Sequence, residues 1–151
     1  MYFVWLSADE QRVWRNYLTM TARLQSAMSR QLQADCGLSL ADYDVLVALE
    51  EQRGCRIAEL GERLGWEQSR LSHQLSRMRA RGLVVRSGAA DDRRAATVDL
   101  TDDGRAALTS AAPGHAELVR DVVFKGASAA QLRALDTWTS QVLARLGQSP
   151  A

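Results

Sequence analysis

Residues 91–104 read DDRRAATVDLTDDG. Two acids run directly into two arginines, and residues 97–100 (TVDL) then alternate between polar and apolar side chains. Alternation with a period of two is typical of a strand with one buried face. Upstream, residues 83–86 (LVVR) have the β-branched composition of a partner strand. The sequence therefore predicts a β-hairpin with arginines at its tip.

Helical periodicity dominates the chain before this hairpin. Apolar residues recur at helical spacing over residues 7–34, 39–54 and 57–64, and the first two segments begin at a serine suited to capping. A fourth helix is expected over residues 67–81, with a glycine directly after it. Two helices around a short glycine-containing turn, followed by strand, turn and strand, are typical of a winged helix-turn-helix, in which the hairpin is the wing.

The chain after the hairpin is predicted to be helical. Residues 101–104 (TDDG) resemble a helix N-cap, and the long helix that follows is expected to be interrupted at Pro113 and Gly114. A last helix is expected after residues 125–128. The predicted fold class is therefore mainly α with a small β-hairpin wing.

Composition excludes several classes of protein. The chain is 46% hydrophobic and 25% charged, as in ordinary folded proteins, and no apolar run approaches the ~18 residues of a membrane span. The N-terminus has no basic region and too short an apolar run for a signal peptide, so we expect a cytoplasmic protein without a membrane partner. Its two cysteines and two histidines lack metal-ligand spacing, and we expect neither metal nor cofactor. No Walker loop, Ser/His/Asp group or paired-carboxylate motif has a suitable context, so we expect no enzyme.

Positive charge concentrates in one segment. Between Gln68 and Arg94 there are seven arginines against two acids, a local charge of +5 in a chain whose net charge is +1. The segment contains both the fourth helix and the hairpin, so double-stranded DNA is the expected partner.

The fourth helix has two contrasting faces. At ~100° per residue, its aliphatic side chains Leu71, Leu75 and Met78 share one face. The side chains expected to contact DNA are Ser69, Arg70, Ser72, His73, Gln74 and Arg77. Of these, Arg70, His73 and Gln74 are long enough to reach bases, where an arginine–guanine or glutamine–adenine pair is worth roughly 1–3 kcal/mol of discrimination. The serines are expected on phosphates, and a solvated helix face with incidental arginines is the alternative.

The hairpin tip suits the adjacent minor groove. That groove is narrow and its potential is negative, which favours an inserted guanidinium. We expect Arg94 to enter the groove, Asp92 to hold its guanidinium, and Arg93 to lie on phosphate. The alternative is a turn in which acids and bases pair only for solubility.

These segments resemble the MarR (multiple antibiotic resistance regulator) family of transcription factors. The most specific pattern, D-x-R-x-x-x-V-x-L-T-x-x-G, occupies residues 92–104, and S-x-x-S-x-x-L-x-x-M-x-x-x-G-L-V occupies residues 69–84. Residues 37–49 (GLSLADYDVLVAL) resemble the family's second helix, and the resemblance covers nearly the whole chain. His73 stands where many members carry an arginine, so the bases that they read at that position are not transferred to this chain.

The resemblance implies a homodimer. In that dimer the local charge of +5 is doubled, and binding to DNA is then expected to weaken steeply with salt. The resemblance divides the chain into a winged helix-turn-helix over residues 37–104 and a helical dimerisation region over residues 1–36 and 105–148. The interface is expected to include large apolar side chains of the first and last helices: Val13, Leu132, Leu135, Trp138 and Val142. A two-fold dimer presents its recognition helices ~34 Å apart, so the operator should be a pseudo-palindrome.

The resemblance also implies a repressor that leaves DNA when a small aromatic or anionic effector binds. The aromatic residues expected at such a pocket are Trp14, Tyr17 and Tyr43, each of which also lies on an apolar helical stripe where core packing is the alternative. A redox-switched DNA binder that uses Cys36 or Cys55 is the alternative function. A winged helix that binds protein would expose an apolar face at residues 69–77, and this segment is polar.

Overall fold

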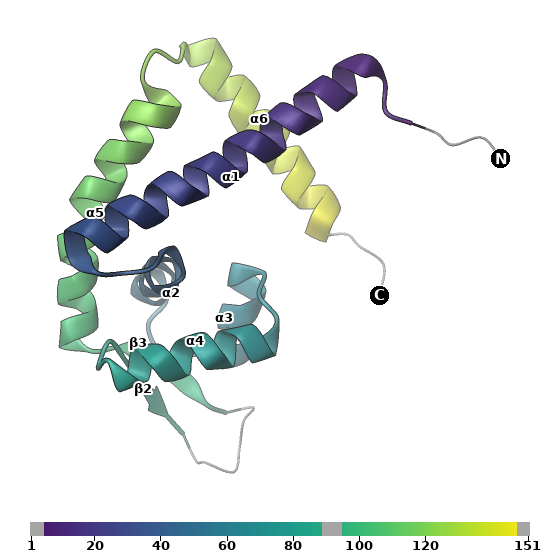
Figure 1. Ribbon diagram of the computed structural model, residues 1–151. Coiled ribbons are helices and arrows are strands. Elements are labelled where there is room, and N and C mark those ends of the chain that lie inside the picture. Colours follow the sequence, from purple (N-terminus) through teal and green to yellow (C-terminus); the bar gives the residue numbers. More distant parts are fainter. Residues whose placement is uncertain (1–4, 89–94, 148–151) are drawn as a thin grey trace. The chain divides into compact units, whose positions relative to one another are not determined.

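The computed structural model describes residues 5–88 and 95–147 (Figure 1). Its contacts divide the chain into two compact units, Met1–His115 and Ala116–Ala151. The first unit contains the helix-turn-helix, the wing and also the first helix. The division falls inside the fifth helix, at a different place from the expected boundary between residues 104 and 105. The functional division into a DNA-binding and a dimerisation region stays a prediction.

The first two helices begin at the predicted serine caps. Helix α1 (Ala8–Cys36) has a capping box, in which the Ser7 hydroxyl accepts from the Glu10 amide and the Glu10 carboxylate accepts from the Ser7 amide. Ser39 forms the same reciprocal pair with Asp42 at the start of α2 (Leu40–Glu51). Side-chain caps satisfy amides that the first helical turn leaves without partners, so these local signals set where each helix begins.

The helix-turn-helix consists of α3 (Ile57–Leu64) and α4 (Gln68–Ala80). The turn between them passes through Gly65 at φ +65°, a left-handed conformation that glycine adopts without steric cost. The apolar core beneath joins fully buried side chains of α2, α3 and α4: Val45, Leu46, Leu49, Leu60, Leu71 and Met78. This shared core fixes one face of α4 against the domain and leaves the other outside.

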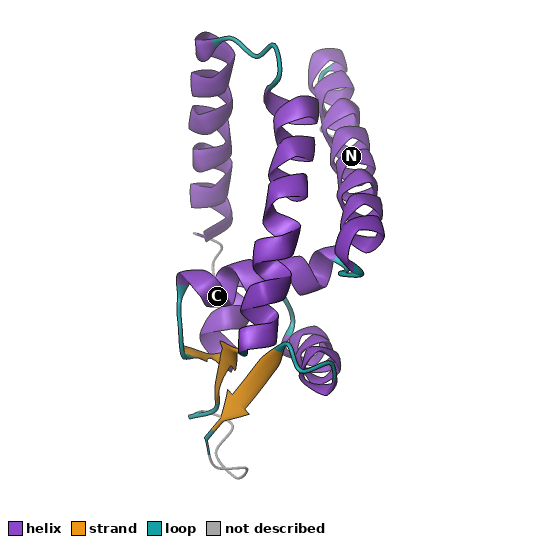
Figure 2. Ribbon diagram, turned by 90° about the vertical axis from the view of Figure 1, so that its left-hand side faces the viewer, coloured by secondary structure: helices purple, strands orange, loops and turns teal. Residues whose placement is uncertain are grey.

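The wing is a three-stranded antiparallel sheet in the order β1-β3-β2. Strands β2 (Val84–Ser87) and β3 (Thr97–Leu100) pair as predicted, and they project from the helices of the first unit (Figure 2). Strand β1 (Cys55–Arg56), which pairs with the other edge of β3, was not predicted. Two residues are too few to show an alternating pattern, so this strand is defined only by its partner.

The start of α5 (Asp102–Val119) explains the TDDG motif. The Thr101 hydroxyl accepts from the Gly104 amide at 3.0 Å and donates to the Gly82 carbonyl. A Cβ atom at Gly104 would lie 2.1 Å from the Leu83 carbonyl oxygen. Glycine is therefore required by this close approach, which docks α5 against the residue that precedes β2.

The predicted interruption at Pro113 and Gly114 is wrong. Helix α5 continues through both residues to Val119, and a π-helical turn (Arg120–Phe124) follows, in which the Lys125 amide donates to the Arg120 carbonyl. Proline costs a helix one hydrogen bond but does not always end it. Here Ala111 is buried against the core, and packing of α5 outweighs the local effect of proline.

The second unit contains the end of α5, the π-helical turn and α6 (Ala129–Gly147). Helix α6 begins after the predicted break, at a reciprocal cap between Ser128 and Gln131. In the described ranges no helix combines the length and the apolarity that crossing a bilayer requires.

Candidate nucleic-acid interface

Helix α4 exposes the polar face that the sequence predicts. Leu71, Leu75 and Met78 are buried in the core, which confirms the aliphatic face. On the opposite side the exposed side chains are Ser69, Arg70, Ser72, His73, Ser76 and Arg77. Small serines between longer cations let a helix backbone come close to base edges while offering donors and acceptors.

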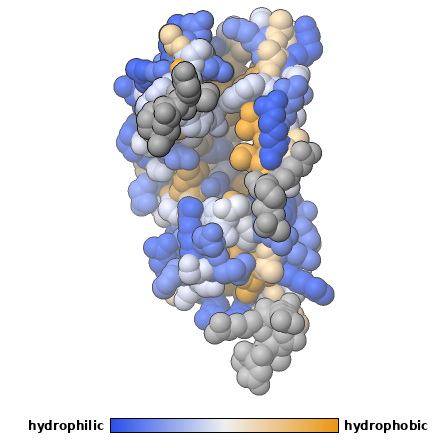
Figure 3. Space-filling model, turned by 90° about the vertical axis from the view of Figure 1, so that its right-hand side faces the viewer, coloured by the Kyte–Doolittle hydropathy of each residue, from blue (hydrophilic) through white to orange (hydrophobic). Residues whose placement is uncertain are grey.

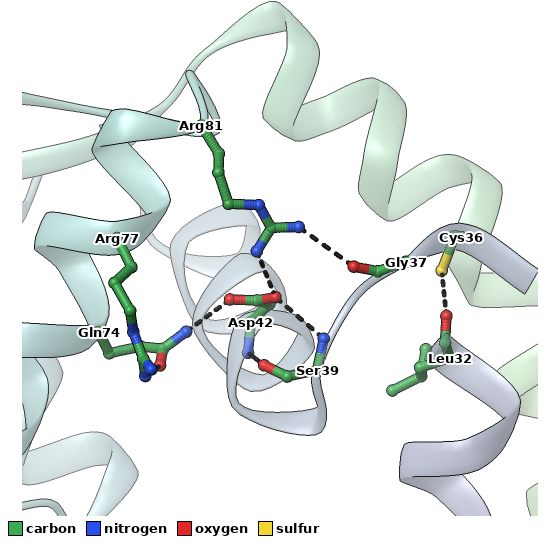
Figure 4. Close-up of polar contacts among 8 residues, drawn as sticks. All are labelled: Leu32, Cys36, Gly37, Ser39, Asp42, Gln74, Arg77 and Arg81. Atoms are coloured by element: carbon green, nitrogen blue, oxygen red, sulfur yellow. Dashed lines mark hydrogen bonds and ion pairs between the residues drawn. The ribbon is translucent and has the colours of Figure 1, made fainter. Parts of the chain in front are cut away.

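Gln74 does not belong to this exposed face. The residue is only 3% exposed, and its side-chain amide donates to the Asp42 carboxylate of α2 at 2.5 Å (Figure 4). The expectation that Gln74 reaches a base does not fit this burial, and we omit it from the DNA-contacting set. The sequence indicates this burial, because residue 74 lies three positions after Leu71 and four before Met78, on the apolar face of the helix.

Asp42 is the buried charge that sequence reasoning missed. The residue is 3% exposed, and its carboxylate accepts from the Ser39 amide at 2.9 Å, from Gln74, and from Arg81 at 2.7 Å. Burial alone would raise the pKa of Asp42, but the bonds and charge of Arg81, together with Ser39, outweigh it and lower the pKa. Asp42 is therefore ionised at neutral pH and acts only as an acceptor.

Arg70 lies over an aromatic ring. Its guanidinium carbon is 4.2 Å from the ring centre of Trp66, which precedes α4 in the turn. A cation over an indole face at this distance gains electrostatic attraction from the ring. Trp66 is also packed against the hydrophobic core, so it is a fixed platform for the arginine. The four-residue spacing from Trp66 to Arg70 is the signal that sequence analysis did not use.

A shallow hollow of about 130 Å³ separates α4 from the wing. Its polar lining comes from Ser72, Ser76 and Arg79 of α4 and from Arg86 of β2. Two arginines and two hydroxyls above an apolar floor suit a backbone phosphate, and Arg79 and Arg86 were not in the predicted contact set. The hollow thus extends the positive face of α4 onto the wing.

The predicted wing-tip residues lie outside the described residues. They are Asp92, Arg93 and Arg94. The strands that carry the tip are described, and β3 is tied to two helices by Arg105 near the start of α5. Arg105 forms ion pairs with Asp99 of β3 at 3.9 Å and with Glu50 of α2 at 3.6 Å. Arg105 thus lies between the base of the wing and α2.

The aromatic residues expected at an effector pocket occupy two places. Trp14 and Tyr17 stack on α1 with ring centres 5.7 Å apart. Tyr43 of α2 lies against His115 of α5, with ring centres 4.4 Å apart, and borders a hollow of about 260 Å³ between α2 and α3.

The chemistry around Tyr43 is unusual for a helical core. Burial raises the pKa of Asp44 and, together with the Asp44 charge, that of the Tyr43 hydroxyl. Burial also lowers the pKa of His115, although Asp44 opposes this shift. The Nδ1 atom of His115 is buried and has no hydrogen-bond partner within the described part of the chain.

The cysteines do not resemble reactive thiols. Cys55 is fully buried, and burial, reinforced by Glu59, raises the pKa of its thiol, which disfavours the nucleophilic thiolate. Cys36 is half-buried, and its thiol donates to the Leu32 carbonyl at 3.1 Å. Neither environment favours the redox alternative. Among the residues that the structure describes, no group of three potential metal-ligating side chains occurs.

Large apolar side chains remain at the surface of both units, and one face of the molecule shows them as orange patches among hydrophilic residues (Figure 3). Four of the five predicted interface residues are exposed: Val13, Leu132, Leu135 and Trp138. Val142 is half-buried. Further exposed apolar side chains are Leu18 and Met20 on α1, and Val122, Phe124, Leu143 and Leu146 in the second unit.

Comparison with known proteins agrees with this geometry. The sequence model of the MarR family matches residues 37–95. The chain is similar to Sco3205 of Streptomyces coelicolor, a MarR family transcriptional regulator solved in complex with DNA. They are 36% identical with a TM-score of 0.86, over 97% of this chain and 92% of that one. AbsC, a MarR family regulator of the same organism, is 32% identical with a TM-score of 0.89, over 97% of this chain and 100% of that one.

A curated relative is more distant. The HTH-type transcriptional regulator YfiV of Bacillus subtilis is 26% identical over 119 residues, which is 78% of this chain and 73% of that protein. The fold is also shared with MarR of Staphylococcus aureus, which was solved in complex with salicylate and kanamycin. That chain is 15% identical with a TM-score of 0.80, over 93% of each chain.

Proposed function

Because the chain belongs to the MarR family of DNA-binding transcriptional regulators, we propose that two copies of it bind one pseudo-palindromic operator and repress transcription there. The observation that carries this proposal is the exposed face of α4, where serines and arginines stand opposite a fully buried aliphatic face. No catalytic constellation is needed for this activity. It requires only that each protomer brings its α4 to a major groove.

The proposed DNA contacts are of two kinds: contacts to the backbone that position the protein and contacts to bases that read the sequence. Ser69, Ser72 and Arg77 bind phosphates, while Arg70 and His73 reach base edges. Arg94 enters the minor groove, Asp92 supports it, and Arg93 binds phosphate. The arginines that line the hollow between α4 and β2 support this arrangement, because they continue the positive surface from the helix toward the wing.

The homodimer is supported by apolar surface that a single chain leaves exposed. Val13 on α1 and Leu132 and Leu135 on α6 are each at least 40% exposed. Burying such side chains gains roughly 25 cal/mol per Å² of apolar surface, which is the usual driving force for association. Two copies joined through their terminal helices would bury these residues and place both α4 helices on one duplex.

A small aromatic or anionic effector binds next to Tyr43 in this proposal and shifts the dimer to a form with lower affinity for DNA. The hollow that Tyr43 borders supports a site there, because apolar side chains (Val47, Ala48 and Leu64) line it together with the cation Arg63. Trp14 and Tyr17 are secondary candidates.

Selection from random duplex DNA tests the proposal. The purified 151-residue chain should enrich two inverted half-sites whose centres lie about 10 base pairs apart, as a two-fold dimer requires. Sedimentation of the protein with the enriched duplex should give two chains per duplex. Enrichment of a single isolated half-site would contradict the dimeric operator, and no enrichment at all would contradict sequence-specific binding.

A further inference from the structure

We propose that buried Asp42 acts through Gln74 as a positioning residue that aims Arg77 at DNA. The inference rests on the proposed function in one respect, namely that Arg77 contacts the operator. It assigns to a residue of α2, inside the domain, control over a side chain on the exposed face of α4. Figure 4 shows the three side chains in line, from Asp42 through Gln74 to Arg77.

The first step is the polarity of the Gln74 amide. The ionised Asp42 carboxylate only accepts hydrogen bonds, so Gln74 must present its NH2 group to it, as it does at 2.5 Å. The amide oxygen of Gln74 then points away from Asp42. In that position it accepts from the Arg77 guanidinium at 2.6 Å. The charge of Asp42 thus determines which end of the amide faces Arg77.

The second step is how Asp42 itself is held. Its Oδ2 atom accepts from the Ser39 amide and from Arg81, while its Oδ1 atom accepts from Gln74. Arg81 also donates to the Gly37 carbonyl at 3.2 Å, where α1 ends. The carboxylate therefore joins the α1–α2 junction to α4 and cannot rotate without breaking these bonds.

The consequence is that Arg77 is partly ordered before DNA arrives. A free arginine must give up rotamer freedom when it binds phosphate, and a prior hydrogen bond reduces that cost. Its contact with Gln74 uses only part of its donor fork, so other N–H groups stay available for a phosphate.

Asp42→Asn is the variant that tests the relay. The oxygen of Asn at this position would keep the bonds to Ser39 and Arg81, which leaves its NH2 group facing Gln74. The Gln74 amide must then turn over and present its own NH2 group to Arg77, a donor facing a donor. We expect Arg77 to lose order, and affinity for the selected operator to fall about three- to ten-fold, the cost of immobilising one long side chain.

A double-mutant cycle separates this effect from general damage to the fold. In an Arg77→Ala background, Asp42→Asn should cause no further loss of affinity. Arg79→Ala is the matched control, because Arg79 is another exposed arginine of α4 outside the relay, and in that background Asp42→Asn should keep its full effect. Equal losses in both backgrounds would overturn the proposal. Unfolding curves establish that each variant is folded at the assay temperature.

A variant that exchanges the carboxylate and the amide between positions 42 and 74 should restore the order of Arg77. In Asp42→Asn combined with Gln74→Glu, the amide donates to a carboxylate that accepts from Arg77, so the chain of hydrogen bonds is restored at the same net charge. NMR relaxation of the Arg77 side-chain Nε–H should report high order in the original protein, low order in Asp42→Asn and recovered order in the double variant. Arg77 remaining ordered in Asp42→Asn, or disordered in the double variant, would overturn the relay. If the protein binds no duplex, the proposed function fails, while this measurement still decides the role of Asp42.

Discussion

The guanidinium of Arg70 lies 4.2 Å above the indole ring of Trp66, so the arginine expected to read a base is already supported by an aromatic platform. Trp66 stands in the turn of the helix-turn-helix and packs on the core, whereas Arg70 is on the exposed face of α4. The same helix therefore holds two arginines in prepared positions, Arg70 by a ring and Arg77 by the amide of Gln74.

Trp66→Leu should weaken discrimination between bases. A cation–π contact at an exposed site contributes about 0.5–1 kcal/mol, so the ratio of operator affinity to the affinity for an operator altered at the Arg70 contact should fall about two- to five-fold. Competition binding on both duplexes measures this ratio. Trp66→Phe keeps an aromatic ring, so its affinity ratio should lie between those of the original protein and Trp66→Leu. If Trp66→Leu lowers the ratio equally in an Arg70→Ala background, Trp66 does not act through Arg70.

Replacing Arg94 of the wing and replacing Arg70 of α4 should change DNA affinity in different ways. Arg94→Ala should weaken binding to operator and random DNA alike, because minor-groove and phosphate contacts are largely independent of sequence. It should also reduce the steepness of the salt dependence. Arg70→Ala should instead relax preference at particular base pairs. Binding isotherms on operator and random DNA at several salt concentrations distinguish the two kinds of contact. Equal losses of affinity for both variants on both duplexes would contradict the prediction.

Gly104→Ala should destabilise the first unit by about 3 kcal/mol, since the new methyl group would lie 2.1 Å from the Leu83 carbonyl oxygen and the backbone must move. Gly147→Ala is the matched control, because a Cβ there has nothing within 4 Å. Denaturant unfolding of both variants measures the difference. A loss below 1 kcal/mol for Gly104→Ala would show that α5 is not docked as closely as described.

Stability should decrease as the pH falls below about 6.5. Burial lowers the pKa of His115, although Asp44 opposes the shift, so the unfolded chain takes up a proton at a pH where the folded chain does not. The free energy of unfolding therefore falls between the unfolded pKa and the lower folded pKa. Denaturant unfolding at pH 7.5 and pH 5.5 measures this change. His115→Gln should reduce the difference, and an unchanged difference would exclude His115 as its source.

Trp138→Glu should convert the dimer to monomer. The side chain lies on the exposed apolar face of α6, where a buried carboxylate would be costly in an interface. Sedimentation velocity at micromolar concentration distinguishes the two states. Gln141→Glu, a change at an exposed polar position of the same helix, is the control and should leave the dimer intact. A dimeric Trp138→Glu variant would place the interface elsewhere.

Local signals in the sequence predicted most of the fold. Capping serines and threonines such as Ser7, Ser39 and Thr101 bond within their own helical turn, so their effect is readable without tertiary structure. Pro113 is the opposite case. The conformational preference of proline predicted a break, but packing around Ala111 sustains the helix. That packing depends on residues elsewhere in the chain, so the proline alone does not reveal it.

The exposed face of α4 could be predicted from local helical spacing. The buried contacts that hold its side chains could not. Helical spacing placed Ser69, Arg70 and His73 outside. The interaction of Gln74 with Asp42 joins residues 32 positions apart, and no local period reports such a contact. A polar residue on an apolar stripe, as at position 74, is the signal that indicates a buried partner.

Hydroxyl-radical footprinting on the selected operator tests the central claim most directly. If two protomers present α4 and the wing to one duplex, the cleavage pattern should show two protected backbone regions, related by two-fold symmetry and spaced by about one helical turn. Protection in a single region, or uniform protection without symmetry, would contradict the account.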